Sequence, residues 1–336
     1  MGDKADDKKF HVVGIGNAIV DVLAKTDDAF LERHGMAKGG MTLIDEITAG
    51  TLYGQLPVPI EQSGGSVANT MAGMASLGAK CAFVGKVCDD LLGQRFTDAI
   101  REIGVTFETP PAKDSTSTAR CLICVTPDAQ RTMMTFLGTC VELGPRDIDP
   151  EMIAAGEILY LEGYLWDPPE AKEAFLRAAT IAHEAGNKVS LSLSDPFCVD
   201  RHREDFLQLL EGHVDILFAN EQEIKTLYQV EEFDDALQYV RGHCEIAALT
   251  RSELGSVVVS GDEVHVIDAA PVEEVVDTTG AGDAYAAGFL YGLTHHLGLR
   301  DSAHVGGVAA AEVISHLGAR PSEPLGSLIE HKLNIT

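Results

Sequence analysis

Short runs of β-branched and other apolar residues alternate along the chain with longer segments in which apolar residues recur at helical spacing. A chain that alternates in this way buries its strands most readily as a parallel sheet with helices packed against it. The alternation therefore predicts an α/β protein. The expected strands are 11–15, 82–87, 158–161, 188–193, 214–218 and 246–249, and the expected helices are 67–77, 93–103, 169–185, 221–228, 282–295 and 302–315.

Other stretches depart from this alternation. Residues 256–259 and 263–266 are strand-like and are joined by a Gly-Asp pair, which predicts a hairpin. Residues 39–63 and 114–138 are rich in Thr, Pro, Met and Gly and fit no strand–helix unit. Four glycines just past expected helices are predicted to end them in the left-handed conformation. They are Gly78, Gly104, Gly186 and Gly298.

The charge balance limits the partners of the chain. Its 336 residues carry a formal net charge of −27, from 25 Lys and Arg against 52 Asp and Glu. This excess argues against nucleic acid or an anionic membrane surface as a partner. A phosphate site in so acidic a chain would need a local positive field, supplied by backbone amides, a bound cation or an arginine.

The cysteines and the N-terminus predict a cytoplasmic protein. Seven cysteines are scattered along the sequence, and no secretory leader or membrane-spanning apolar segment is apparent, so we expect reduced thiols. Cys121 and Cys124 lie in a strand-like run, where residues three apart face opposite sides and cannot grip one metal ion. Residues 1–9 have mixed charge and are expected to be mobile.

One run of small residues is the strongest functional signal. Asp277-Thr-Thr-Gly-Ala-Gly-Asp283 leads directly into an apolar helical segment. The backbone amides of Gly280, Ala281 and Gly282 can approach an oxyanion closely, and the helix dipole favours negative charge there. Asp283 would lie beside that anion as a candidate base for the acceptor hydroxyl in phosphoryl transfer. The alternative is that Asp283 caps the helix and the glycines only form a turn.

This run resembles the C-terminal signature of the ribokinase (PfkB-type) family of sugar and nucleoside kinases. The glycine pair in 64–69 and the Asn-x-x-Glu of 220–223 resemble two further family motifs and occur in the family's order. The resemblance implies a three-layer α/β/α sandwich with a mostly parallel central sheet, spanning residues 10–330. It also implies a small β-sheet lid that excludes water from the substrate. The lid segments would be about 18–24, 39–63 and 114–138.

The family's sugar-binding residues can be matched to this chain. Asp21 ends the first strand region, and a carboxylate there can accept hydrogen bonds from two neighbouring hydroxyls. Gly64 and Gly65 would let the backbone approach the sugar, and Asn69 can both donate to and accept from a hydroxyl. The alternatives are an exposed loop carboxylate and an ordinary helix start. The Gly-x-Gly of 14–16 lacks the third glycine of a dinucleotide fingerprint, which weakens an oxidoreductase interpretation.

The resemblance also implies ATP as phosphoryl donor, with Mg²⁺. Glu223 would hold Mg²⁺ directly or through water, although Asn220 and Glu223 also fit a helix capping box. In the family's nucleotide loop, between Thr250 and Gly255, Ser252 replaces an expected glycine. The residues expected at ATP are Asn220, Thr250, Gly255 and Gly282.

Two further features concern positive charge. Many family members have a monovalent-cation site formed by the late loop, here Gly318 to Ser322, and by residues that match Asp277 and Thr279. A K⁺ ion bound there would order the anion-binding turn. Arg131 lies in an expected lid strand. It could reach the transferred phosphate and offset its charge, or it could be a solvated edge residue that discourages strand aggregation.

Several segments resemble the adenosine-kinase group of the family. They are residues 16–21, 191–197 and 214–221. In the first of them the spacing between Asn17 and the following Asp is longer than the Asn-x-Asp of ribokinases. The late loop, in contrast, resembles that of ribokinases. Asn17 is therefore also expected at the substrate. The resemblance makes Phe197 a candidate for stacking on a purine, with other apolar side chains as walls, while core packing is the alternative for each. The expected walls are Ile19, Met133, Leu137 and Leu165.

These observations predict an ATP-dependent phosphotransferase that acts on the 5′-hydroxyl of a nucleoside. Adenosine is the expected acceptor, which would give AMP in purine salvage. The alternatives are a ribokinase or another sugar kinase, and a non-catalytic nucleoside-binding regulator, which would have no need for the base Asp283. The expected partner is a small molecule, and the expected state is a monomer or a homodimer.

Overall fold

The computed structural model describes residues 8–128 and 130–333. Most of the segment 1–9, expected to be mobile, lies outside the described residues. At the end of this segment, the Lys8 ammonium donates to the Ala154 carbonyl at 2.8 Å and to Asn187 Oδ1 at 2.7 Å. None of the described helices has the length and apolar character needed to cross a membrane.

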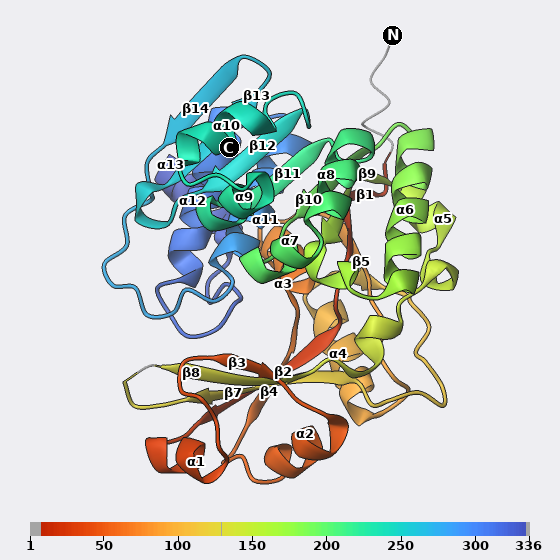
Figure 1. The fold of residues 1–336 in the computed structure, drawn as a ribbon, viewed down its shortest axis with the longest axis vertical. Helices are drawn as coiled ribbons and strands as arrows, with labels where there is room; N and C mark the ends of the chain where they lie inside the picture. Colours follow the sequence, from red (N-terminus) through yellow and green to blue (C-terminus); the bar gives the residue numbers. More distant parts are fainter. Residues whose placement is uncertain (1–7, 129, 334–336) are drawn as a thin grey trace.

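A nine-stranded central sheet forms the body of the molecule (Figure 1). Its order is β14-β13-β12-β11-β10-β9-β1-β5-β6, parallel from β12 to β6 and antiparallel at the β12–β13–β14 edge, where the predicted hairpin lies. The strands are β1 (Phe10–Ile15), β5 (Cys81–Val84), β6 (Thr106–Phe107), β9 (Gly156–Glu162), β10 (Lys188–Ser192), β11 (Ile216–Asn220), β12 (Ile246–Thr250), β13 (Ser256–Ser260) and β14 (Glu263–Ile267).

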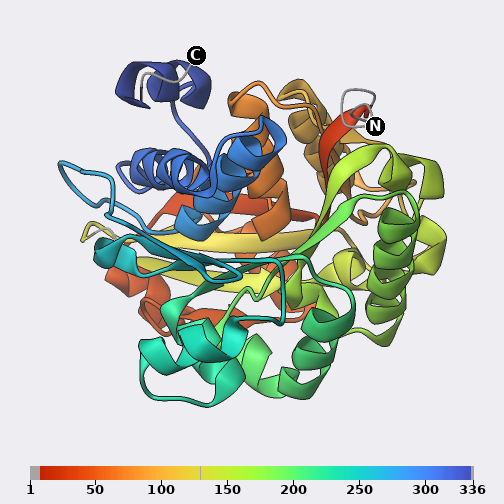
Figure 2. The same cartoon turned by 90° about the horizontal axis from the view of Figure 1, so that it is seen from above.

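Helices cover both faces of this sheet, which confirms the predicted α/β/α sandwich (Figure 2). Successive strand residues face opposite layers, so Val12 and Val13 of β1 belong to different hydrophobic clusters. One layer contains α3 (Ser66–Ser76), α4 (Leu91–Glu102), α11 (Ala281–Thr294) and α12 (Leu299–Val313), with α13 (Leu325–Leu333) packed on α12. The other contains α5 (Pro150–Ala154), α6 (Pro169–Glu184), α7 (Pro196–Arg201), α8 (Arg203–Gly212), α9 (Glu221–Tyr228) and α10 (Phe233–Val240).

A second, five-stranded sheet lies at one end of the body (Figure 1). We call it the small sheet; its order is β3-β8-β7-β2-β4, and its strands come from the segments expected to form a lid. Two short helices, α1 (Asp28–Arg33) and α2 (Glu46–Tyr53), lie on its side away from the body. The strands are β2 (Ile19–Lys25), β3 (Met41–Leu43), β4 (Ile60–Gly64), β7 (Ala119–Val125) and β8 (Arg131–Phe136).

Close packing of α11 against α12 fixes where α11 begins. A Cβ added at Gly288 of α11 would lie 2.7 Å from Gly306 Cα of α12, and one at Gly292 would lie 2.5 Å from Ser302 Oγ. Only glycine allows this approach. The N-terminus of α11 is thereby held near the carboxyl ends of the parallel strands, where α/β proteins bind their ligands.

The left-handed conformation predicted for four glycines is confirmed at three of them. Gly78, Gly104 and Gly186 have φ of 89°, 89° and 75°. The prediction for Gly298 is wrong, because this residue has φ −63° and is the N-cap of α12. His296 takes the left-handed conformation after α11 instead, with φ 59°.

Candidate active site

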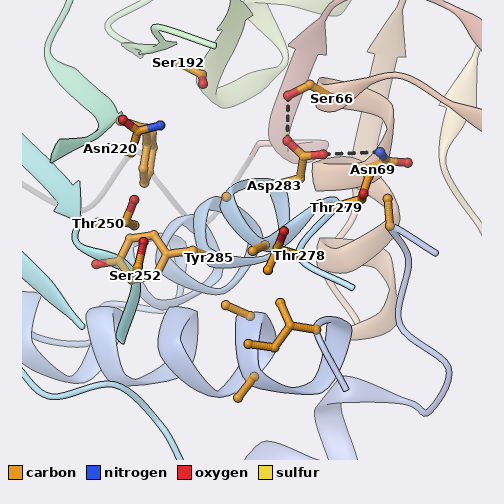
Figure 3. A pocket seen from close by; sticks show the side chains of 18 of the residues that line it. Ser66, Asn69, Ser192, Asn220, Thr250, Ser252, Thr278, Thr279, Asp283 and Tyr285 are labelled. Atoms are coloured by element: carbon orange, nitrogen blue, oxygen red, sulfur yellow. Dashed lines mark hydrogen bonds between the residues drawn. The ribbon is translucent and has the colours of Figure 1, made fainter. Parts of the chain in front are cut away.

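A cavity of about 1110 Å³ lies between the small sheet and the carboxyl ends of the central strands. Its walls come from both sheets and from the start of α11. In Figure 3, Ser66 and Asn69 lie on one side of Asp283, and Asn220, Thr250 and Ser252 lie across the pocket. The volume exceeds that of most single-ligand pockets and suits two substrates side by side.

Asp283 is held between two side chains of α3 (Figure 3). Ser66 Oγ donates to Asp283 Oδ1 at 2.6 Å, and Asn69 Nδ2 donates to Asp283 Oδ2 at 3.2 Å. Burial raises the pKa of Asp283 to about 6, and the two hydrogen bonds act in the opposite direction. The carboxylate is therefore oriented, and it is ionised near neutral pH, as a general base requires.

A second carboxylate, Asp21, lines the same cavity. Burial raises its pKa to about 6, and the positive charges of Arg320 and Arg131 offset part of that rise, while Asp283 adds to it. Arg320 Nε also donates to Asn69 Oδ1 at 3.2 Å, so Asn69 links an arginine to Asp283. Burial lowers the pKa of Arg320 to about 10, which leaves it charged at neutral pH.

The glycine pair is required by its surroundings. A Cβ at Gly64 would lie 2.2 Å from Asp21 Oδ2, and a Cβ at Gly65 would lie 2.1 Å from the Asn17 carbonyl oxygen. Gly65 also has φ 100°, which disfavours other residues. Gly65 lines the cavity, whereas Gly64 lies behind it and leaves room for the Asp21 carboxylate.

The turn before α11 forms an open helix N-terminus at the cavity. Gly280 is the N-cap, with φ 79° and no side-chain cap, and a Cβ there would lie 2.7 Å from Ala319 Cα. Gly280, Ala281 and Gly282 all line the cavity, and Gly282 has open space around its Cα. Backbone N–H groups in this arrangement are suited to binding a phosphate.

Asn17, expected at the substrate, is buried behind the cavity instead. Its Nδ2 donates to Glu162 Oε1 at 2.7 Å, and Glu162 Oε2 accepts from the amide of Val67 at 3.0 Å. Burial raises the pKa of Glu162 to about 7, against the effect of these hydrogen bonds. Glu162 thus ties the β1–β2 turn to the start of α3, beside Ser66.

The expected nucleotide residues Asn220, Thr250 and Gly255 line the opposite part of the cavity. Ser252, at the position of the family's glycine, has a left-handed backbone with φ 50°, and Gly255 has φ 80°. A non-glycine residue in this conformation costs about 1–2 kcal/mol. Ser252 thus takes a backbone conformation that favours glycine, and its side chain adds a hydroxyl at the cavity wall.

Asn220 and Glu223 form a capping box at the start of α9, as the alternative interpretation had it. The backbone N–H of Glu223 donates to Asn220 Oδ1 at 2.8 Å, and the backbone N–H of Asn220 donates to Glu223 Oε2 at 2.8 Å. Glu223 still lines the cavity, and burial raises its pKa to about 7. Among residues 8–128 and 130–333 no cluster of three or more His, Cys, Asp or Glu could hold a metal. Mg²⁺ bound to nucleotide phosphates keeps several of its waters and needs only one or two protein carboxylates. A single carboxylate such as Glu223 would therefore be sufficient.

The side chains expected around a monovalent cation are already engaged. Asp277 Oδ1 accepts from the Thr279 amide at 3.0 Å, and Asp277 Oδ2 accepts from the Gly318 amide at 2.9 Å. Arg131 forms an ion pair with Asp277, so its interpretation as a solvated edge residue is wrong. Ser322 Oγ donates to Glu312 Oε1 at 2.7 Å, away from Asp277.

Of the expected purine contacts, only Ile19 and Met133 line the cavity. Leu165 is fully buried in the other helical layer, because it faces the α6 side of the central sheet. Leu137 precedes a 3₁₀ turn outside the cavity lining. Phe197 is 78% exposed on α7 and lies outside the lining, so this structure shows no stacking position for it.

Ser66, Arg320 and Glu162 were not singled out by the sequence motifs. Ser66 directly follows the glycine pair, and Arg320 lies in the late loop, so both had a local signal. Glu162 is the last residue of an apolar strand. A single carboxylate at the carboxyl end of a strand indicates a residue near the ligand site.

Comparison with known proteins identifies the family. Residues 59–325 match the pfkB family carbohydrate kinase domain. The chain therefore belongs to this kinase family, which confirms the resemblance of its motifs, and membership implies ATP as phosphoryl donor.

Individual relatives differ in substrate. Adenosine kinase from Sinorhizobium meliloti is 50% identical, with a TM-score of 0.89 over 96% of this chain and 99% of that one. A probable sugar kinase from Rhizobium etli CFN 42 is 47% identical, with a TM-score of 0.91 over 98% and 100%. A 5-dehydro-2-deoxygluconokinase from Lacticaseibacillus casei is 28% identical over 284 residues, 78% of this chain and 83% of that protein.

Proposed function

We propose that the chain transfers the γ-phosphoryl group of ATP to the 5′-hydroxyl of a nucleoside, with adenosine as acceptor and AMP as product. The observation that carries this proposal is Asp283, an oriented carboxylate at the open N-terminus of α11 that shares one cavity with Asp21 and Asn69. The identity of half the aligned residues to an adenosine kinase supports the choice of acceptor.

In this account Asp283 accepts the proton of the attacking hydroxyl. Ser66 and Asn69 hold its carboxylate, so no reorientation is needed when the acceptor arrives. The amides of Gly280, Ala281 and Gly282 stabilise the negative charge of the transferring group, because they are fixed before the reaction begins.

The sugar hydroxyls are placed on the other side of Asp283. Asp21, the Gly65 backbone and Asn69 bind them, and Arg320 keeps Asn69 oriented. Residues of the small sheet, including Ile19 and Met133, line the cavity above the acceptor. The small sheet then acts as a lid, which limits transfer of the phosphoryl group to water.

ATP occupies the part of the cavity lined by Asn220, Thr250 and Gly255. Glu223 would hold Mg²⁺ directly or through water, and the ion would neutralise the donor phosphates. This positive charge matters in an acidic chain, because no Lys, Arg or His is among the described residues that line the cavity.

A sugar kinase of the same family is the second candidate. Two observations favour it. Three expected purine contacts, Leu137, Leu165 and Phe197, lie outside the cavity, and one similar structure is a probable sugar kinase. Asp283 and Asp21 keep their roles in this alternative. A non-catalytic regulator is disfavoured because the base and the anion-binding turn are both complete.

The variant Asp283→Asn tests the catalytic role. Asparagine keeps the shape of the side chain but cannot take a proton, so turnover should fall by roughly 10²–10⁴-fold with the melting temperature nearly unchanged. Asp301→Asn is the matched control, since Asp301 is exposed in the first turn of the neighbouring helix α12. Turnover of Asp283→Asn close to that of the native chain would remove Asp283 from the mechanism.

A further inference from the structure

The anion-binding turn has a built-in positive charge. Arg131 of β8 forms an ion pair with Asp277, three residues before Gly280, and both side chains are more than nine-tenths buried. Unlike a bound ion, this guanidinium is a covalent part of the chain and cannot dissociate from it. The carboxylate that the family resemblance assigns to a monovalent cation is therefore already neutralised.

The other groups expected at the cation site are also already hydrogen-bonded. The two carboxylate oxygens of Asp277 accept hydrogen bonds from the backbone N–H groups of Thr279 and Gly318. These bonds connect the turn to the late loop. Ser322 is held by Glu312, to which both its amide and its hydroxyl donate, at 2.9 Å and 2.7 Å. A K⁺ ion would need several free oxygens and would have to lie beside a buried like charge.

We propose that the Arg131 guanidinium replaces the monovalent cation of the anion-binding turn, so that this kinase works without K⁺. The proposal rests on the proposed kinase function. Because Arg131 belongs to the small sheet, the ion pair joins that sheet to the turn that begins α11.

The test compares KCl, NaCl and tetramethylammonium chloride at equal ionic strength. Native turnover with Mg-ATP should differ by less than about twofold among the three salts, because ionic-strength screening is the same in each. Arg131→Gln removes the charge and should lower turnover by about 10²-fold in tetramethylammonium. K⁺ should then raise both its turnover and its melting temperature, by filling the space beside Asp277. Arg120→Gln, on the neighbouring strand β7, is the control and should show no specific K⁺ effect.

Activation of the native chain by K⁺ of tenfold or more over tetramethylammonium would overturn the proposal. So would an Arg131→Gln melting temperature that is the same in all three salts, because the cation and the guanidinium would then not share a site. The melting measurements need no turnover. A native chain without kinase activity in any salt would therefore refute the proposed function while the cation site could still be tested.

Discussion

Replacing Ser66 by alanine should change the pH dependence of turnover rather than its maximum. Ser66 Oγ donates a 2.6 Å hydrogen bond to Asp283 Oδ1, which stabilises the ionised carboxylate and opposes the rise in its pKa caused by burial. A hydrogen bond to a charged group contributes about 1.5 kcal/mol or more, and 1.36 kcal/mol corresponds to one pKa unit. Losing the bond should therefore raise the pKa of Asp283 by about one unit.

The consequence follows from the sign of this shift. The base must be ionised, so kcat of the native chain should fall below about pH 6, where the pKa of Asp283 lies. In Ser66→Ala the same fall should begin about one pH unit higher. The two enzymes should then differ by about tenfold below pH 6 and converge in alkaline buffer.

The assay is kcat against pH at saturating substrates for the native chain, Ser66→Ala and Ser63→Ala. Ser63 is the matched control because its buried hydroxyl has no hydrogen-bond partner among the described residues. An acidic limb that stays in place in Ser66→Ala, or moves to lower pH, would refute the argument that Ser66 tunes the base.

Three further variants test other parts of the site. Asp21→Ala should weaken acceptor binding far more than ATP binding by calorimetry, and equal losses would contradict its sugar role. Gly280→Ala should destabilise the fold by about 2 kcal/mol and lower turnover, since alanine disfavours φ 79° and its Cβ would lie 2.7 Å from Ala319; an unchanged melting temperature would be unexpected. Ser252→Gly should relieve its left-handed strain and stabilise the fold by about 1 kcal/mol in thermal unfolding, and destabilisation would show that the hydroxyl matters more.

The features that could be predicted from the sequence are local in the chain. The strand–helix alternation determines the layers, because period and length are read within one segment. The turn at Gly280 and Asp283 could be read from seven consecutive residues, and the capping box of Asn220 and Glu223 from four. In each case the groups that interact are neighbours in the sequence.

The features that escaped prediction depend on distant contacts. Leu165 and Ile19 are both apolar, yet one faces the α6 layer and the other the cavity, and sheet geometry decides between them. Ser66 and Asp283 are separated by 217 positions, and Arg131 meets Asp277 only because the small sheet folds over the body. Burial of such pairs has no signature in a single segment.

The most direct test of the account is turnover of Mg-ATP by the native chain with adenosine, inosine, guanosine, ribose and fructose as acceptors. The account predicts the highest kcat/KM with adenosine, with the phosphate found on the 5′-oxygen. Preference for a free sugar would contradict the assignment of the acceptor. Absence of turnover with every acceptor would contradict the catalytic role of Asp283.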